Sequence, residues 1–312
     1  MLYKLECRLI KHRFKKIMKV LVIGGSGMLG HKLVQVLTKR FDVWTTLRSD
    51  YEKYADFGVF DAEKTFSGID VENFETVENL LDKLNPEVVI NAAGLIKQLP
   101  SSKNVVKTLT VNSIFPHRLA ESVSRLDSRL ITISTDCVFD GKKGGYTEED
   151  IPNAVDLYGK SKNLGEVVEG NCLTLRTSVI GRELETAHSL VEWFFSKEGK
   201  TVKGFKNAIY SGFPTVVLAD IIGDLIENQK NLRGLYHVSG DPINKYELLC
   251  LIKKEFNLNI EIEPESEFQI DRSLDSTKFR QKTGFVPQTW DEMIKRMADD
   301  PTPYNRWRKR IT

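Results

Sequence analysis

Hydrophobic residues in this chain alternate between short uninterrupted runs and longer stretches with helical spacing. An apolar run that begins at position 18 passes into glycines, and the ten residues from position 31 repeat apolar positions every three or four residues. This succession of strand and helix recurs to about position 180. The pattern predicts strands at 18–23, 41–47, 87–94, 129–139 and 172–180, and helices at 31–40, 77–84, around 106–126 and in the segment that carries Tyr158.

Several of these predicted strands are apolar along their whole length, which is typical of a parallel sheet that helices cover on both faces. We therefore expect an α/β fold with a doubly wound parallel sheet of the Rossmann type. It should occupy residues 18–180, with 208–240 returning to it.

The alternation of strands and helices weakens after position 180. Segments 245–256 and 289–300 have helical spacing, and little strand pattern is obvious near them. We expect residues 181–207 and 241–312 to form a smaller, mainly helical lobe that binds the substrate.

Composition and charge exclude several classes of protein. The chain has 312 residues, of which 41% are hydrophobic and 28% charged, as in an ordinary globular protein. A net charge of +2 gives no reason to expect a nucleic-acid partner. No run approaches the roughly 18 apolar residues that a membrane span needs, so membrane insertion is not expected.

The first 17 residues differ from the rest in charge. They carry six basic residues against Glu6, a net of +5, so the remainder carries about −3. Their apolar positions are too interrupted for a secretory signal. We expect residues 1–17 to be a disordered, dispensable extension of a cytoplasmic protein. The cysteines are far apart in sequence and predict neither a disulfide framework nor a metal site: Cys7, Cys137, Cys172 and Cys250.

Three glycines mark the junction of the first strand with the first helix. Gly24, Gly27 and Gly30 are spaced G-x-x-G-x-x-G, and glycine there lets the backbone approach a pyrophosphate at the helix N-terminus. A turn that serves packing alone is the alternative, which the position after the first strand of a βαβ unit disfavours. The second strand ends without a carboxylate before Asp50. Arg48 could instead pair with a 2′-phosphate, which favours NADPH, although a solvated arginine and NADH remain alternatives.

A second candidate site follows later strands. Tyr158 and Lys162 are four residues apart, which places both on one face of a helix. A tyrosine has a pKa near 10 and needs a neighbouring cation to exchange a proton readily at neutral pH. Thr135 ends a predicted buried strand, and ligands of open α/β sheets bind beyond such strand ends.

These motifs, with NAAG at 91–94, VNSIFP at 111–116, STDCVFDG at 134–141 and YGKSK at 158–162, resemble the extended short-chain dehydrogenases/reductases. The chain is most similar to the dTDP-4-dehydrorhamnose reductases, also in LRTSVIG at 175–181 and in LDSTKFRQKTGF at 274–285. The resemblance covers nearly all of the chain from Met18.

The resemblance implies a role for each catalytic residue. Thr135 would hydrogen-bond the substrate carbonyl, Tyr158 would donate the proton, and Lys162 would bind the nicotinamide ribose and lower the tyrosine pKa. Asn112 would support the lysine. The cofactor would contact Gly24, Ser26, Gly27, Met28, Leu29, Gly30, Arg48, Ser49, Asp70, Val71, Asn91, Ala92, Ala93, Gly94, Asn112, Ser134, Tyr158 and Lys162.

The expected reaction is reduction of the C4 keto group of a 4-keto-6-deoxy sugar linked to dTDP or UDP, for a surface polysaccharide precursor. In the related dehydratases, the catalytic threonine is followed by Asp-Glu, and the glutamate removes a proton from the sugar. This chain has Asp136 and Cys137 at these two positions, so it lacks the base that dehydration requires. The similar GDP-fucose synthases epimerise with a cysteine and a histidine, but the histidine position corresponds to Glu183 here. We expect Cys137 to line the substrate pocket without epimerising.

Other readings remain open. A 4-epimerase or an epimerase/reductase would use the same tyrosine and lysine, and the regulatory subunit of methionine adenosyltransferase uses this fold without catalysis. A homodimer is a further expectation. Residues expected at the substrate are Asp136, Cys137, Arg182, Glu183 and Lys206; His188, Asn207 and Arg272 are further candidates, and Trp193 is expected in the core.

Overall fold

The structure is a computed structural model that describes residues 17–311 of the chain. The predictions for the basic extension and for Cys7 therefore lie outside the described residues, apart from the exposed Ile17. Among the residues described, no helix combines the length and the apolar character that crossing a membrane requires.

The larger sheet has seven strands in the described chain, and every pair of neighbouring strands is parallel. The strand order is β10-β6-β5-β4-β1-β2-β3, which is the doubly wound arrangement that the sequence predicted. Its strands are β1 (Lys19–Ile23), β2 (Asp42–Thr46), β3 (Thr65–Phe66), β4 (Val88–Asn91), β5 (Arg129–Thr135), β6 (Cys172–Thr177) and β10 (Gly234–His237).

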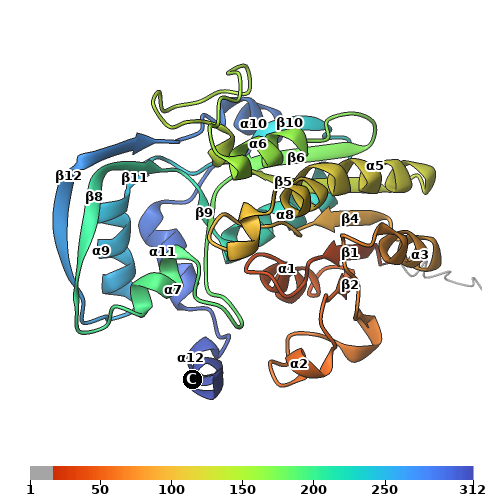
Figure 1. Cartoon of the computed structure of the whole chain (residues 1–312), viewed down its shortest axis with the longest axis horizontal. Coiled ribbons are helices and arrows are strands. Elements are labelled where there is room, and N and C mark those ends of the chain that lie inside the picture. The colour runs from red at the N-terminus through yellow and green to blue at the C-terminus, as the bar shows by residue number, and fades with distance from the viewer. Residues whose placement is uncertain (1–16, 312) are drawn as a thin grey trace, which may run out of the picture.

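Helices cover both faces of this sheet (Figure 1). Successive residues of β1 enter different hydrophobic clusters, Val20 and Val22 on one face and Leu21 and Ile23 on the other, because side chains alternate along a strand. The first cluster includes residues of α1 (Gly30–Leu37) and α8 (Thr215–Asn228). The second includes residues of α3 (Phe74–Leu84) and α5 (Phe115–Arg125). Burial on both faces explains the continuous apolar runs in the sequence.

The chain order of the strands reverses between β1 and β4, which are neighbours in the sheet. In open α/β sheets, ligands bind beyond the carboxyl ends of the strands at such a switch point. Gly24 follows β1, Asn91 ends β4 and Thr135 ends β5. The predicted cofactor and catalytic residues therefore come together at one edge of the sheet.

The helix predicted around 106–126 is interrupted. It consists of α4 (Val105–Leu109), a π-helical segment (Thr110–Ile114) and α5. A π-helical turn is rare and often marks a functional site. Here it carries Asn112. The polar loop that the sequence predicted after β2 also contains α2 (Glu52–Ala55) and the short β3.

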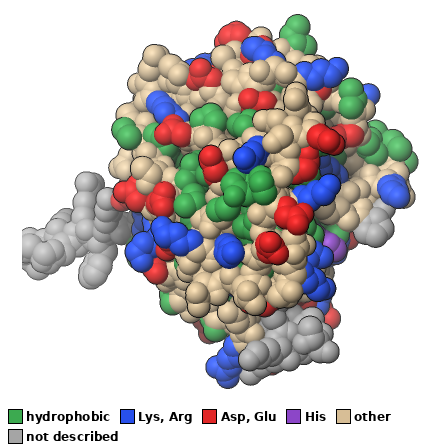
Figure 2. All heavy atoms as spheres, turned by 90° about the vertical axis from the view of Figure 1, so that its left-hand side faces the viewer, with side chains coloured by type: hydrophobic (Ala, Val, Ile, Leu, Met, Phe, Trp, Pro, Cys, Tyr) green, Lys and Arg blue, Asp and Glu red, His purple; other side chains and the backbone are tan. Residues whose placement is uncertain are grey.

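The second lobe contains more strand than the sequence indicated. A three-stranded sheet of order β11-β8-β12 is formed by β8 (Thr201–Tyr210), β11 (Ile243–Asn244) and β12 (Glu261–Asp271), and α9 (Lys245–Glu255) packs against β8. The strand β12 escaped prediction because most of its residues are exposed and many are charged, so no apolar alternation marks it. Figure 2 shows this face of the molecule, where charged side chains surround a group of hydrophobic ones.

The remaining elements complete the first lobe, the second lobe and the junction between them (Figure 1). They are α6 (Leu157–Leu164), β7 (Val179–Ile180), α7 (Leu190–Phe195), β9 (Phe213–Pro214), α10 (Thr277–Thr283), α11 (Trp290–Ala298) and α12 (Tyr304–Ile311).

In α7, Val191 and Phe194 are buried, whereas Trp193 is 36% exposed. The Lys197 ammonium lies 5.9 Å from the centre of the Trp193 ring. The prediction of a core position for Trp193 was therefore wrong.

Candidate functional site

The glycine turn is too tightly packed for side chains at two of its three glycines. Gly24 has φ of +87°, and a Cβ atom there would lie 2.9 Å from the backbone nitrogen of Ala93. A Cβ atom at Gly30 would lie 2.0 Å from the Gly24 carbonyl oxygen. A Cβ atom at Gly27 would lie 3.3 Å from that same oxygen, and within 4 Å it would meet no other atom of residues 17–311 outside its immediate chain neighbours. The missing Gly27 side chain therefore leaves space on the outer side of the turn.

The open side of the turn suits an anionic group. The turn leads into α1, whose first backbone N–H groups have no partner within the helix and carry partial positive charge. Ser26, Met28 and Leu29 lie between the glycines. An approaching pyrophosphate would meet backbone donors rather than side chains.

Three further segments predicted to contact the cofactor lie near this turn. The Asn91 side chain accepts a hydrogen bond of 3.2 Å from the nitrogen of Ala93, which holds the segment 91–94 in its bend next to Gly24. On the other side, Leu47 is hydrogen-bonded through its backbone to Phe66 and Ile69. Arg48–Ser49 and Asp70–Val71 therefore leave the sheet side by side, and Arg48 is exposed.

Asn112 links the loop after β4 to the catalytic helix. Its amide nitrogen donates to the Leu95 carbonyl at 3.0 Å and to the Ser161 hydroxyl at 3.2 Å, while its oxygen accepts from the Leu95 nitrogen at 2.9 Å. A Cβ atom at Gly165 would lie 1.9 Å from the Asn112 carbonyl oxygen, so α6 packs closely on the π-helical turn. Asn112 thus positions the helix that carries Lys162.

Thr135, Tyr158 and Lys162 meet at the carboxyl end of β5. The Tyr158 and Thr135 side chains lie near each other, and the Lys162 ammonium donates to the Ile133 carbonyl at 2.7 Å. Burial raises the pKa of the Tyr158 phenol, the neighbouring Cys137 and Asp136 groups raise it further, and the Thr135 side chain acts in the opposite direction. The phenol is therefore protonated at neutral pH, as a proton donor must be. Burial lowers the pKa of Lys162 to about 8, which leaves it mostly charged at pH 7.

Sequence reasoning missed a buried ion pair beside the lysine. Glu166 accepts two hydrogen bonds of 2.7 Å from the Arg176 guanidinium and one of 2.6 Å from the Ser134 hydroxyl. The charge of Glu166 raises the pKa of Lys162 and so opposes the effect of burial. The spacing of Glu166 four residues after Lys162 is visible in the sequence, but only the fold shows Arg176 on β6 opposite it.

Asp136 and Cys137 follow Thr135 in a short turn. Burial raises the pKa of the Asp136 carboxyl. Burial, with a smaller contribution from Asp136, raises the pKa of the Cys137 thiol to about 11. A thiol with this pKa is almost entirely protonated at neutral pH and is a poor base.

Three cationic residues gather around this turn. Arg272, at the end of β12, donates to the Phe139 carbonyl at 2.9 Å and lies 3.9 Å from the Cys137 sulfur. The charge of Lys97 acts to lower the pKa of Cys137. Lys245, at the start of α9, is close enough to Cys137 for a thiolate there to raise the pKa of Lys245. Burial and then the charge of Lys97 lower the pKa of Lys245. Within residues 17–311 none of the three cations forms an ion pair, so an anion would relieve their mutual repulsion.

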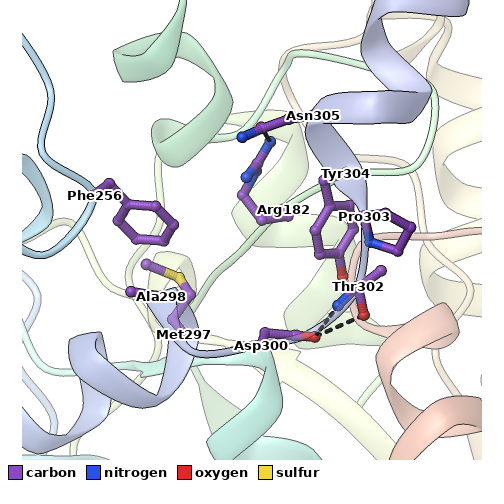
Figure 3. A pocket seen from close by; sticks show the side chains of 9 residues that line it. All are labelled: Arg182, Phe256, Met297, Ala298, Asp300, Thr302, Pro303, Tyr304 and Asn305. Atoms are coloured by element: carbon purple, nitrogen blue, oxygen red, sulfur yellow. Dashed lines mark hydrogen bonds between the residues drawn. The ribbon is translucent and has the colours of Figure 1, made fainter.

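Two residues predicted at the substrate, Arg182 and Glu183, have partners within the protein. Arg182 pairs with Glu192 at 2.8 Å and donates to Asn305 at 2.9 Å, on the wall of a cavity of about 160 Å³ (Figure 3). Burial would raise the pKa of Glu183, but hydrogen bonds from Thr186 and Ser189 hold it below its ordinary value.

Lys206 lies on the exposed side of β8, and its ammonium is 5.6 Å from the centre of the Tyr246 ring. Tyr246 is the chain neighbour of Lys245. Sequence reasoning missed Lys97, which follows a predicted strand, and Lys245, which begins a predicted helix. Among the described residues, no group of three or more His, Cys, Asp or Glu is placed to hold a metal ion.

Comparison with known proteins identifies relatives over most of the chain. The family described as the RmlD substrate binding domain matches residues 18–302. Methionine adenosyltransferase 2 subunit beta from Mus musculus is 30% identical over 254 residues, which is 77% of this chain and 72% of the relative. The dTDP-4-dehydrorhamnose reductase from Aggregatibacter actinomycetemcomitans is 27% identical over 301 residues, 89% of this chain and 97% of the relative.

Solved structures are similar over the same range. A hypothetical dTDP-4-dehydrorhamnose reductase from Sulfolobus tokodaii has 31% identity and a TM-score of 0.72, and the match covers 88% of this chain and 98% of that one.

Proposed function

Because this chain belongs to the RmlD substrate binding domain family of extended short-chain dehydrogenases/reductases, we propose that it reduces the C4 keto group of a nucleotide-linked 4-keto-6-deoxy sugar with NADPH, for a surface polysaccharide precursor. The chain is an NAD(P)-dependent oxidoreductase of nucleotide sugars. The observation that carries the proposal is the proximity of Thr135 to Tyr158, which shares α6 with Lys162, at the sheet edge where the glycine turn follows β1.

The residues of the site divide the chemistry among them. NADPH, when bound, supplies a hydride. The Thr135 and Tyr158 hydroxyls would hydrogen-bond the sugar carbonyl, and Tyr158 would deliver the proton to its oxygen as negative charge develops there. Lys162 would hold the nicotinamide ribose and stabilise the phenolate that remains. Its present contact with the Ile133 carbonyl keeps the ammonium near this position.

The cations Lys97, Lys245 and Arg272 support a substrate with an anionic group. The diphosphate of a nucleotide sugar carries the charge that would offset their repulsion, and Arg272 is suited to phosphate because its donors form a planar fork. Lys206 would approach the same group from β8. Residues that contact the base would decide between dTDP and UDP, so the experiment uses sugars linked to each nucleotide.

The preference for NADPH over NADH rests on Arg48. Arg48 is exposed beyond the end of β2, where the 2′-phosphate of NADPH would lie. On the neighbouring segment, the Asp70 carboxylate already accepts a hydrogen bond of 3.0 Å from the backbone nitrogen of Glu72. A homodimer and a cytoplasmic location remain predictions.

One alternative has a specific observation in its favour. Methionine adenosyltransferase 2 subunit beta is a relative at 30% identity, which raises a regulatory role. A regulatory subunit does not require a tyrosine, a threonine and a lysine in a proton-transfer arrangement. The raised pKa of Cys137, about 11, also disfavours epimerisation through this thiol.

The test follows NADPH absorbance with 4-keto-6-deoxy sugars linked to dTDP or to UDP, and then identifies the product stereochemistry. Wild type should consume NADPH stoichiometrically, and Tyr158→Phe should lose roughly 10²–10⁴-fold in rate with nearly unchanged NADPH affinity. Sugar conversion without net loss of NADPH would identify an epimerase. NADPH binding without turnover of any such sugar would favour the regulatory role.

A further inference from the structure

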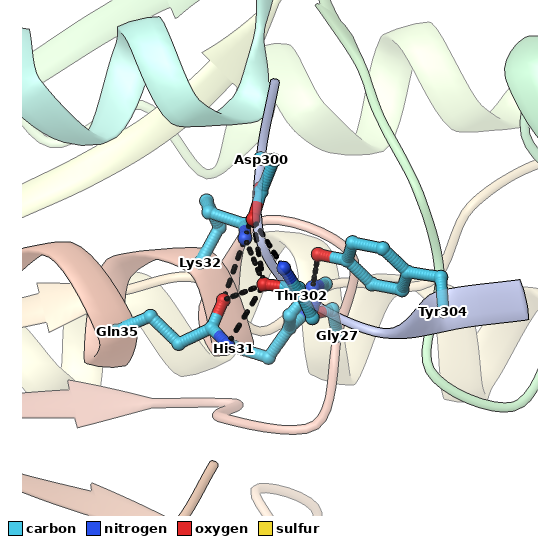
Figure 4. A network of polar contacts seen from close by, with 7 residues as sticks. All are labelled: Gly27, His31, Lys32, Gln35, Asp300, Thr302 and Tyr304. Carbon is cyan, nitrogen blue, oxygen red and sulfur yellow. Dashed lines mark hydrogen bonds and ion pairs between the residues drawn. The ribbon is translucent and has the colours of Figure 1, made fainter. Parts of the chain in front are cut away.

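A segment near the carboxyl end of the chain lies between the glycine turn and the second lobe. We call residues 300–307, which follow α11, the C-terminal strap. On the first lobe the strap contacts α1: the Tyr304 hydroxyl lies 2.7 Å from His31 Nε2, and the Lys32 ammonium contacts Asp300 at 2.5 Å and Thr302 at 3.2 Å (Figure 4).

His31 connects the strap to the glycine turn. The imidazole is fully buried, and its Nδ1 lies 2.9 Å from the Gly27 carbonyl oxygen (Figure 4). Burial lowers the pKa of His31 to about 4, so the ring is neutral and carries one proton. The carbonyl can only accept, so the proton lies on Nδ1 and Nε2 accepts from the Tyr304 hydroxyl. Tyr304 thus selects the tautomer that gives the Gly27 carbonyl a second donor, beside the backbone N–H of His31, which donates to the same oxygen at 3.1 Å.

The orientation of the Gly27 carbonyl has a direct consequence for the turn. The carbonyl of Gly27 and the N–H of Met28 belong to one planar peptide group and point in opposite directions. A hydrogen bond that holds the carbonyl toward His31 therefore holds the Met28 N–H in the opposite direction. The backbone of the turn offers its donors to a pyrophosphate on that outer side.

The strap is itself fixed from both lobes. The Tyr304 ring lies 5.0 Å from the Arg182 guanidinium, which the ion pair with Glu192 and the contact with Asn305 keep in place (Figure 3). Trp307 packs edge-on against Phe57 of the first lobe, with ring centroids 4.9 Å apart. Tyr304 is 4% exposed, so its hydroxyl has a fixed position.

We propose that Tyr304 is a positioning residue of the cofactor site, acting through His31 on the Gly27–Met28 peptide group of the glycine turn. The proposal rests on the proposed function only in that a nicotinamide dinucleotide binds at this turn. Tyr304 would thus contribute to cofactor binding although it lies in the other lobe, 273 positions from His31 along the chain.

The experiment is a double-mutant cycle read by direct binding. NADPH is titrated calorimetrically into wild type, Tyr304→Phe, His31→Asn and the double variant. Tyr304→Phe keeps the ring on Arg182 and removes only the hydroxyl, and it should weaken NADPH binding roughly three- to tenfold, as expected for one buried hydrogen bond. The double variant should bind NADPH no more weakly than His31→Asn, because Tyr304 acts through His31.

The matched control is Tyr146→Phe, which removes another buried tyrosine hydroxyl, bonded to Asp140 at 2.9 Å and far from the glycine turn in sequence. It should lower the melting temperature without changing NADPH affinity. Asp300→Asn tests the strap independently through Lys32 and should also weaken NADPH binding.

Three outcomes separate the proposals. Unchanged NADPH affinity in Tyr304→Phe, or losses that add in the double variant, would overturn the role of Tyr304 even if wild type reduces a sugar. If Tyr146→Phe weakens NADPH binding as much as Tyr304→Phe, the effect is one of general stability and the proposal also fails. Absence of NADPH binding by wild type would instead refute the proposed function.

Discussion

Replacement of Lys162 by methionine should make the protein more stable and inactive at the same time. The ammonium is taken out of water, and the Ile133 carbonyl is the hydrogen-bond acceptor recorded for it. Burial lowers its pKa from 10.5 to about 8, and the charge of Glu166 offsets this only in part. The folded state therefore binds the proton of Lys162 more weakly than the unfolded chain does, which penalises folding wherever the unfolded lysine is charged.

The size of the penalty follows from the pKa difference. The lowered pKa corresponds to a penalty of roughly 3 kcal/mol, at about 1.4 kcal/mol per pKa unit. The side chain keeps some contact with solvent, and the lost hydrogen bond to Ile133 costs roughly 1–2 kcal/mol. Methionine retains most of the aliphatic packing, so the net gain in the free energy of unfolding should be about 1–2 kcal/mol at pH 7.

The pH dependence has a definite sign. The penalty is complete below about pH 8, decreases between about pH 8 and pH 10.5, and disappears above that range. The advantage of Lys162→Met over wild type should therefore be present at about pH 7 and lost near about pH 10.5.

Urea unfolding at these two pH values measures the difference. Lys160→Met is the matched control, since Lys160 is an exposed lysine on the same helix, and it should change stability by less than about 0.5 kcal/mol. A Lys162→Met variant that is less stable than wild type at pH 7 would refute the reasoning, because the ammonium would then be a net stabiliser.

Two further variants test the electrostatics and the cofactor preference. For wild type, kcat/KM should fall as the pH rises through about 8, because Lys162 then loses its proton. In Glu166→Gln this fall should move to lower pH, because the Glu166 carboxylate raises the pKa of Lys162. A pH profile that is the same in both proteins would contradict this. Arg48 should make NADPH bind at least roughly tenfold more tightly than NADH through a charge-assisted contact, and Arg48→Ala should abolish the difference in a titration; equal affinities in wild type would exclude the contact.

The sequence alone was enough to predict the doubly wound sheet and the arrangement of the glycine turn. Both depend on local patterns, because a strand buried on both faces must be apolar throughout and the spacing of the glycines is set within one turn. The spacing of Tyr158 and Lys162 is equally local, since residues four apart share a helix face.

The strand β12 was not predicted, because pairing with β8 rather than burial of its own side chains keeps it in the sheet. An exposed, charged strand has no hydrophobic period for sequence reasoning to detect.

Only the tertiary structure decided which distant residues act together. Arg272 reaches Cys137 across 135 positions of chain, and Tyr304 reaches His31 across 273. Neither pair has a signal in sequence spacing, because each contact is made where the second lobe packs against the carboxyl edge of the sheet. Likewise, Arg182 could be predicted as a polar residue near the substrate, but its pairing with Glu192 depends on the position of α7. Local periodicity determines the elements, whereas the packing between lobes determines which charges and hydroxyls meet.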